Sequence, residues 1–300
     1  MLDPKALLDW TGGPAFGWVV GAATLYWLGG RRTAHSADGS RLRTACFVAG
    51  LATIVAALDS SIDELSEQLL WVHMVQHIML LVVAPPLLAL AGPWNRMWHG
   101  LPLGFRRRTA GAVAQSPRLA PVRRTARVLQ DPVVAWLAFN VTFVAWHIPA
   151  AYDATLQHPF VHALEHAMFF GTALLFWTRV IDSPPWRSPL SDVPRAVYLG
   201  LAMVVSWVLA IAFAVSTAPV YAPYAAEASR PGGLTALADQ QLAAGVMWVP
   251  GSIPLTIGIL FIMYRWLQPN RGGQGPRPQP AARYPGLSGE ENHAATGHLD

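Results

Sequence analysis

The sequence predicts an all-α integral membrane protein, a bundle of seven transmembrane helices. Its residues are 53% hydrophobic and only 13% charged, whereas about 25% of the residues of an ordinary soluble domain are charged. A helix needs about 20 consecutive apolar residues to cross the ~30 Å hydrocarbon core of a bilayer. The stretches that meet or approach this length are 14–30, 43–59, 69–91, 132–148, 160–180, 194–216 and 239–266.

The basic residues predict which side of the membrane each loop faces. If consecutive loops alternate sides, only Lys5 and Arg230 of the 21 Lys and Arg residues fall on one side, and acidic residues such as Asp63 and Glu227 gather there. Lys and Arg are enriched in cytoplasmic loops. We therefore expect an external N-terminus and a cytoplasmic C-terminus, as an odd number of spans requires.

The net charge of +4 and the pI near 9.6 do not indicate a nucleic-acid partner. The arginines are spread over several short loops, where membrane topology and the anionic lipid headgroups of the bilayer account for them. The richest loop, 92–131, is expected to carry an amphipathic surface helix. A membrane domain of residues 1–267 precedes residues 268–300, which are rich in Pro, Gly and Gln and predict a disordered cytoplasmic tail.

Six of the ten histidines are expected at the outer ends of the spans. His73 with His77, and His162 with His166, have i, i+4 spacing, so each pair presents two imidazoles on one helix face. His147 closes the fourth predicted span at the same depth. Polar side chains are costly in hydrocarbon and rarely gather there without a function. The histidines therefore predict a metal site within the membrane.

Other side chains are candidates to complete or support this site. Asp239 opens the last predicted span and is expected to supply a carboxylate, and imidazole with carboxylate suits copper or zinc. Glu165 is either a hydrogen-bond acceptor for a ligating imidazole or an acid near the interface. His158, which precedes Pro159 in an expected loop, is a weaker candidate. The remaining auxiliary candidates are Met74, Met247, Asp59 and Gln240.

Thioether sulfur would favour Cu(I), although methionine in a membrane helix usually serves packing. Cys46 is the only cysteine, which excludes an internal disulfide and a Cys-x-x-Cys metal motif.

Three blocks of sequence contain most of these polar residues. The first is Val72-His73-Met-Val-Gln-His77-Ile-Met-Leu-Leu, followed by Ala84-Pro-Pro-Leu-Leu-Ala-Leu-Ala-Gly-Pro93. The second runs from His147-Ile-Pro-Ala-Ala-Tyr152-Asp153 to His158-Pro-Phe-Val-His162-Ala-Leu-Glu165-His166. The third is Asp239-Gln-Gln-Leu-Ala-Ala-Gly-Val-Met247-Trp248-Val-Pro250. Together they resemble the seven-span CtaG family of cytochrome c oxidase assembly factors.

This resemblance implies a bacterial plasma-membrane protein that is not an enzyme and that matures the copper-containing terminal oxidase, with oxidase subunits as its partners. The positions matching the family are His73, His77, His147, His162, His166 and Asp239. The copper centres of the oxidase lie toward the outer half of the membrane or beyond it. A factor that hands over copper there should hold its own ligands at that depth.

Two other functions stay open at this point. A zinc-dependent intramembrane hydrolase would use three histidines, an aspartate and a serine around zinc, with Ser60, Ser61, Asp59 and Asp239 supplying the remaining groups. The His162-x-x-Glu165-His166 pattern also occurs in inverted zinc peptidases, but three fixed residues make a weak match. A b-type haem protein would use two histidines from different helices, for example His77 and His166.

Overall fold

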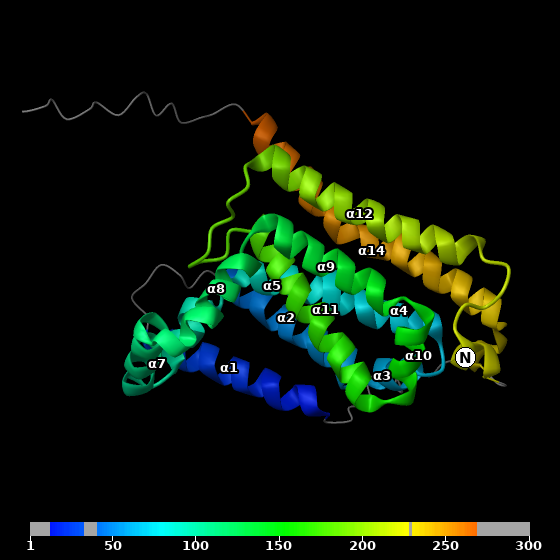
Figure 1. Ribbon diagram of the computed structural model, residues 1–300, viewed down its shortest axis with the longest axis horizontal. Coiled ribbons are helices and arrows are strands. Elements are labelled where there is room, and N and C mark those ends of the chain that lie inside the picture. Colours follow the sequence, from blue (N-terminus) through cyan, green and yellow to red (C-terminus); the bar gives the residue numbers. More distant parts are fainter. Residues whose placement is uncertain (1–12, 33–40, 228–229, 269–300) are drawn as a thin grey trace, which may run out of the picture.

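The computed structural model describes residues 13–32, 41–227 and 230–268, which form helices joined by mostly short connections (Figure 1). These ranges contain no strand, so the predicted all-α class is confirmed. The predicted C-terminal tail lies outside the described residues, except for Gln268. The elements are α1 (Pro14–Arg32), α2 (Arg41–Leu58), α3 (Ser61–Ser66), α4 (Leu70–Ile78), the π-helical turn η2 (Met79–Val83), α5 (Ala84–Ala91), α6 (Trp94–Gly100), α7 (Leu103–Gln115), η3 (Pro117–Leu119), α8 (Ala120–Leu129), α9 (Pro132–Trp146), α10 (Pro149–Gln157), α11 (Pro159–Val180), α12 (Asp192–Val215), α13 (Ala222–Ala226), η4 (Pro231–Gly233) and α14 (Ala236–Leu267).

Within the described part of the chain, the number of candidate spans is lower than the seven that the sequence predicts. Five helical stretches are long and apolar enough to cross a membrane: α2, Leu70–Ala91, α11, α12 and α14. A sixth arises only if α9 is joined to Pro117–Leu129, from which it is bent by 83°. The structure therefore supports five or six spans by length and composition.

Local sequence signals explain why α9 is short. The carboxylate of Asp131 accepts hydrogen bonds from the backbone N–H groups of Val133 and Val134, and Pro132 occupies the first helical position, where proline is favoured. The helix ends at Trp146 with His147 as its C-cap residue, and Pro149 starts α10. The 15 residues of α9 extend only ~22 Å at 1.5 Å per residue, which is less than the ~30 Å hydrocarbon core.

The first predicted span forms a helix, α1, but α1 is not among the candidate spans. Its glycines and its terminal Arg31-Arg32 pair lower its hydropathy. It packs against α6, where a Cβ atom on Gly29 would collide with the Arg96 carbonyl. Arg32 donates hydrogen bonds to three carbonyls at the end of α6, at 2.9 to 3.0 Å. Helix α1 is therefore attached to the segment that follows the third predicted span.

The helices that carry the candidate site are packed side by side. Helix α12 runs along α14, α14 packs on α4, α11 packs on α9, and α2 packs on α5 (Figure 1). The short helices α3, α10 and α13 lie at one end of the bundle, and α7 and α8 lie at the other (Figure 1). Neither α7 nor α8 has a buried residue, as expected of helices on a surface.

The span Leu70–Ala91 is interrupted by the π-helical turn between α4 and α5. Pro85 and Pro86 have no N–H group, so the Leu81 carbonyl has neither an i+4 nor an i+5 donor in its own helix. The indole Nε1 of Trp177, on α11, donates a hydrogen bond to this carbonyl at 3.0 Å. Trp177 is buried. This bond joins α11 to the broken span in the interior of the bundle.

Replacing Trp177 by Phe should destabilise the protein by about 1–3 kcal/mol, because it leaves the buried Leu81 carbonyl without a donor. Trp136→Phe is a matched control. Its indole donates to the Tyr198 carbonyl at 3.1 Å, but that carbonyl lies inside α12 and keeps its helical donor. Thermal unfolding in detergent should show the larger loss for Trp177→Phe. Equal losses would mean that the indole contributes packing only.

Candidate metal centre

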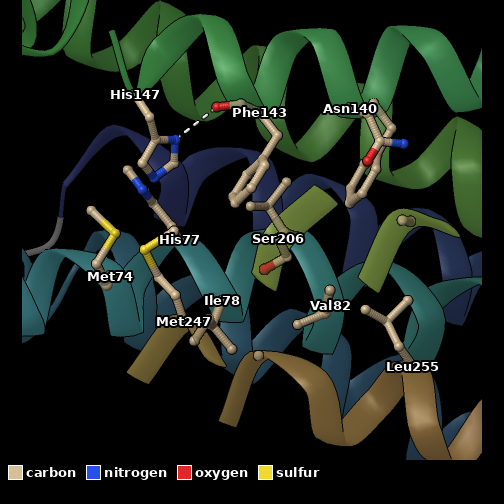
Figure 2. Close-up of a pocket in the computed structure, with 14 residues that line it drawn as sticks. Met74, His77, Ile78, Val82, Asn140, Phe143, His147, Ser206, Met247 and Leu255 are labelled. Atoms are coloured by element: carbon tan, nitrogen blue, oxygen red, sulfur yellow. Dashed lines mark hydrogen bonds between the residues drawn. The ribbon is translucent and has the colours of Figure 1, made fainter. Parts of the chain in front are cut away.

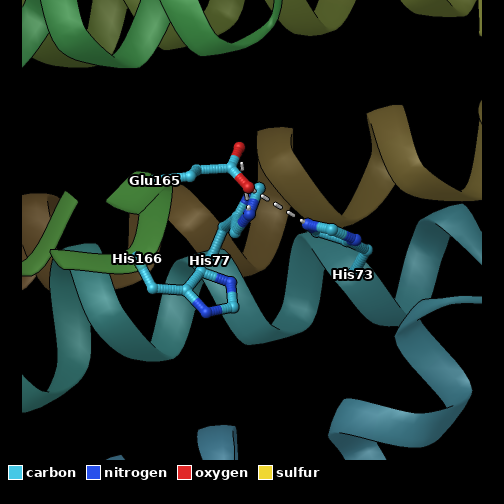
Figure 3. Close-up of side chains that lie close together, drawn as sticks. All are labelled: His73, His77, Glu165 and His166. Atoms are coloured by element: carbon cyan, nitrogen blue, oxygen red, sulfur yellow. Dashed lines mark ion pairs between the residues drawn. The ribbon is translucent and has the colours of Figure 1, made fainter. Parts of the chain in front are cut away.

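Two helices bring three imidazoles and one carboxylate together inside the protein. His73 and His77 come from α4, and Glu165 and His166 come from α11 (Figure 3). All four side chains are buried, and one nitrogen or oxygen atom from each lies within 4.8 Å of the corresponding atoms of the others. Among the described residues, this is the group whose composition and spacing suit a metal ion.

Within each i, i+4 pair the two imidazole rings lie close together, as their spacing predicts. The ring centroids are 4.3 Å apart for His73 and His77 and 4.2 Å apart for His162 and His166. Across the helices, His77 lies 5.7 Å from His166 and 5.9 Å from His147. The structure thus brings five of the six candidate histidines into one cluster. His158 is exposed at the end of α10.

Glu165 lies between the histidines of α4, in a more central position than a residue near the interface would have. Its Oε1 is 3.6 Å from Nε2 of His77, and its Oε2 is 3.8 Å from Nε2 of His73 (Figure 3). These distances are too long for hydrogen bonds. The carboxylate therefore faces two imidazoles across a gap, with both of its oxygens buried.

The atoms that converge on this gap have no hydrogen-bond partner in the described part of the chain. They are Nε2 of His73, His77 and His166 and both oxygens of Glu165; Nδ1 of His77 is likewise unpartnered. A buried polar atom without a partner costs about 1–3 kcal/mol, and one accepted explanation is an ion that the polar atoms bind. The residues present therefore fit a metal ion.

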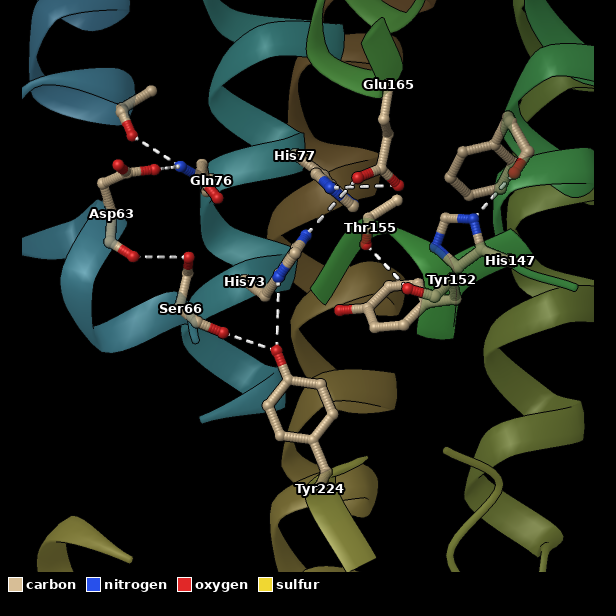
Figure 4. Close-up of polar contacts among 12 residues, drawn as sticks. Asp63, Ser66, His73, Gln76, His77, His147, Tyr152, Thr155, Glu165 and Tyr224 are labelled. Carbon is tan, nitrogen blue, oxygen red and sulfur yellow. Dashed lines mark hydrogen bonds and ion pairs between the residues drawn. The ribbon is translucent and has the colours of Figure 1, made fainter. Parts of the chain in front are cut away.

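The hydrogen bonds of Tyr224, on α13, define which nitrogen of His73 faces the gap (Figure 4). The phenol donates its proton to the Ser66 carbonyl, which can only accept. The phenol oxygen also lies 3.2 Å from Nδ1 of His73, and toward this nitrogen it must be the acceptor. Nδ1 then carries the proton, and Nε2 presents its lone pair to Glu165 and to any ion. Burial raises the pKa of Tyr224 well above its ordinary value, so the phenol keeps its own proton for the bond to the Ser66 carbonyl. Sequence reasoning missed Tyr224 because no pattern links α13 to α4.

Asp239, which the sequence suggests as a ligand, lies at the N-terminus of α4 instead of in the four-residue group. Its two carboxylate oxygens accept hydrogen bonds from the backbone N–H groups of Leu70 and Trp71, each at 3.0 Å. Leu69, the N-cap residue, provides no side-chain cap. Asp239 therefore caps, from α14, the helix that carries His73 and His77.

Of the other polar auxiliary candidates, Gln240 holds segments together, and Asp59 lies beside α1. Gln240 accepts from Val220 N–H at 2.7 Å and donates to the Phe213 carbonyl at 3.2 Å, which fixes the chain between α12 and α13. Asp59 lies close to the start of α1, with the backbone N–H groups of Ala15 and Phe16 facing its carboxylate. Neither residue belongs to the four-residue group.

Gln76 was not recognised in the sequence, although it lies between the two histidines of α4. Its amide donates to the Ala57 carbonyl at 2.8 Å and to Asp63 at 2.7 Å (Figure 4), which ties α4 to α2 and α3. Burial raises the pKa of Asp63, and the hydrogen bond from Gln76 partly offsets this rise. This contact orients α4 from the side of α2 and α3.

A cavity of about 720 Å³ extends between α1 and α2 on one side and α11 on the other. Its walls are mainly apolar, but its polar lining includes Asp63, Glu67, His162 and His166. His162 is half-buried, and its ring centroid is 5.3 Å from that of His73. His162 and His166 therefore lie where the cavity meets the buried cluster.

These features define a multi-pass helical membrane protein with a buried imidazole and carboxylate centre near one end of its bundle. The family model Caa3_CtaG, described as cytochrome c oxidase caa3 assembly factor, matches residues 24–269. The chain belongs to this family, as the three sequence blocks predict.

Curated relatives come from mycobacteria. The chain is 24% identical over 257 residues to Uncharacterized protein Mb0105 of Mycobacterium bovis and to Uncharacterized protein MT0111 of Mycobacterium tuberculosis, a match that covers 86% of this chain and 38% of each relative. It is 22% identical over 233 residues to Uncharacterized protein ML1998 of Mycobacterium leprae, covering 75% of this chain and 34% of that protein. The chain thus spans well under half the length of these relatives. No solved structure gives a significant match.

Replacing Asp239 by Ala should destabilise the protein by about 1–3 kcal/mol, because two backbone N–H groups lose their buried acceptor. Asp239→Asn keeps one carbonyl oxygen and should show a smaller loss. Thermal unfolding in detergent measures both effects. Metal content per folded molecule should stay at the wild-type level in both variants. Loss of metal without loss of stability would make Asp239 a ligand and not a cap.

Proposed function

We propose that this protein helps to assemble the caa3-type cytochrome c oxidase by holding a copper ion at His73, His77, Glu165 and His166 and passing it to an oxidase subunit. The observation that carries the proposal is the convergence of imidazole lone pairs and a carboxylate on one buried gap, with no protein donor to satisfy them. Membership of an oxidase assembly family supports copper over other cargo, because the oxidase is the copper enzyme being assembled.

The distribution of charge supports a location in the bacterial plasma membrane with the cluster near the outer face. Glu165 and Arg179 lie near opposite ends of α11, ~21 Å apart at 1.5 Å per residue. His73 lies in the first turn of the span that ends before Arg96 and the arginines of α7 and α8. Because Lys and Arg are enriched on the cytoplasmic side, the histidine end then faces outward, where an oxidase would receive copper.

The large cavity supports a route to the buried cluster. An ion arriving at the outer face would first meet carboxylates such as Asp63 and Glu67, which line the cavity together with His162. His162 offers an unpartnered Nε2 and lies beside His166. We infer that His162 binds the ion transiently during its transfer to and from the four-residue cluster.

The two other functions considered have less support. Ser60 caps α3 by accepting from Ile62 N–H and also donates to the Ala56 carbonyl, so its hydroxyl is engaged in helix structure and not activated as a nucleophile. A haem held by His77 and His166 would need room for its macrocycle between them. The ligand atoms of His73 and Glu165 lie within 4.8 Å of those of His77 and His166 and occupy that space. Four convergent side chains suit a single ion better.

Replacing His77 by Ala, or Glu165 by Gln, should lower the affinity for copper by about 100-fold or more, since altering even a hydrogen-bond partner of a ligand costs about 10–100-fold. His158→Ala is the matched control, because His158 is an exposed histidine outside the cluster. Copper is measured in protein purified from membranes, together with the activity of the terminal oxidase in the same strain.

The His77 and Glu165 variants should be present in the membrane but yield less copper-loaded oxidase, and added copper should partly restore it because occupancy depends on free metal relative to the dissociation constant. Wild-type copper content and oxidase activity in both variants would sink the proposal.

Replacing His162 by Ala should slow copper uptake while leaving the final occupancy unchanged, because His162 lines the route and lies outside the four-residue cluster. Stopped-flow transfer from a chromophoric copper chelator measures both quantities. His166→Ala serves as the comparison, because it should lower the final occupancy as well. An equal loss of occupancy in both variants would make His162 a permanent ligand, as the sequence alone suggests.

A further inference from the structure

A second group of metal-ligating side chains lies on the other side of His77. It occupies a pocket of about 40 Å³ between α4, α9, α12 and α14. The rest of the lining is mainly apolar but includes Asn140 and Ser206, and His77, His147, Met74 and Met247 gather at one end (Figure 2). A volume of this size can hold an ion, because a single water needs only about 10–15 Å³ by the same measure.

The hydrogen bond of His147 shows which of its nitrogens faces the pocket. Nδ1 is 2.7 Å from the Phe143 carbonyl (Figure 2). A carbonyl can only accept, so Nδ1 carries the proton and Nε2 keeps its lone pair. His147 is 3% exposed, and its Nε2 has no hydrogen-bond partner among the described residues. A buried lone pair of this kind is costly unless something binds it.

The two methionines add soft ligands from separate helices. Met74, on α4, is 1% exposed, and Met247, on α14, is 4% exposed. Packing alone accounts for two buried thioethers, since leucine of similar volume would pack as well. Packing does not account for an unpartnered imidazole nitrogen that lines the same small pocket. Thioether sulfur with imidazole is a ligand set that selects Cu(I).

We propose that this pocket is a second, soft-metal site that takes Cu(I) through Nε2 of His147 and the sulfur atoms of Met74 and Met247. His77 separates it from the four-residue cluster: its ring lines the pocket, while its Nε2 faces Glu165. The ring centroids of His77 and His147 are 5.9 Å apart. Copper held by the proposed cluster thus has a neighbouring site richer in sulfur. The choice of copper rests on the proposed function; the preference for a soft ion rests on the pocket.

The test uses the full-length protein in detergent, with Ag(I) as a redox-inert soft probe and Zn²⁺ as a probe of the four-residue cluster. Met74→Leu/Met247→Leu removes both sulfurs at nearly constant volume. With the cluster loaded with Zn²⁺, this variant should bind Ag(I) about 100-fold or more weakly than wild type, and its Zn²⁺ affinity should be unchanged. Met168→Leu/Met263→Leu is the control, because both residues are exposed and outside the pocket.

X-ray absorption of the wild-type protein loaded with Cu(I) gives a measurement that does not depend on any variant. Sulfur neighbours of the copper are expected, and their loss is expected in Met74→Leu/Met247→Leu. Equal Ag(I) affinity in the two proteins, or copper without sulfur neighbours, would overturn the second site. Absence of Zn²⁺ and copper from the four-residue cluster, with Ag(I) still bound by sulfur, would instead overturn the proposed function alone.

Discussion

The hydrogen bond from Trp177 to the Leu81 carbonyl fixes the relative position of the two helices on which the candidate metal centre depends. Consecutive prolines in the span Leu70–Ala91 free that carbonyl, and in hydrocarbon no water can satisfy it. The indole of α11 does so instead. Because α4 and α11 each supply half of the four-residue cluster, a shift of one helix along the other would separate Glu165 from His77. The break in the span thus sets the alignment of the site.

Polar residues at this end of the bundle divide into two kinds. Asp239 and Gln76 bond to backbone groups and hold α4 in position, and Gln240 does the same for the chain between α12 and α13. The cluster histidines and Glu165 instead keep buried atoms without a protein partner. In the sequence the two kinds look the same, because both are polar residues within apolar stretches. Helical spacing predicts that His73 and His77 share a face, but it cannot predict that Asp239 faces backbone N–H groups of another helix.

The fold class could be predicted from the sequence, but the number of spans could not. Composition and apolar runs predict an all-helical membrane protein; the predicted 160–180 span lies within α11, and the predicted 194–216 span ends one residue beyond α12. The sequence does not predict the span count, because helix length depends on local caps such as Asp131 and on the glycines of α1. The role of Tyr224 was also hidden, since it depends on a contact with a residue 151 positions away.

Placing Glu165 among three imidazoles has a consequence for charge balance. Neutral imidazoles contribute no charge, so a cluster without metal can balance the carboxylate by holding one proton, and a cluster with a singly charged ion needs none. If the cluster holds the proposed singly charged ion, filling it would exchange one proton for one cation at constant net charge. Neither state bears the desolvation cost of an unbalanced ion, which is of order 20 kcal/mol in the idealised limit. A doubly charged ion would leave one positive charge to be met by an added anion. If the proposed ion is monovalent, its release would have to be accompanied by the uptake of one proton for the net charge of the cluster to stay constant.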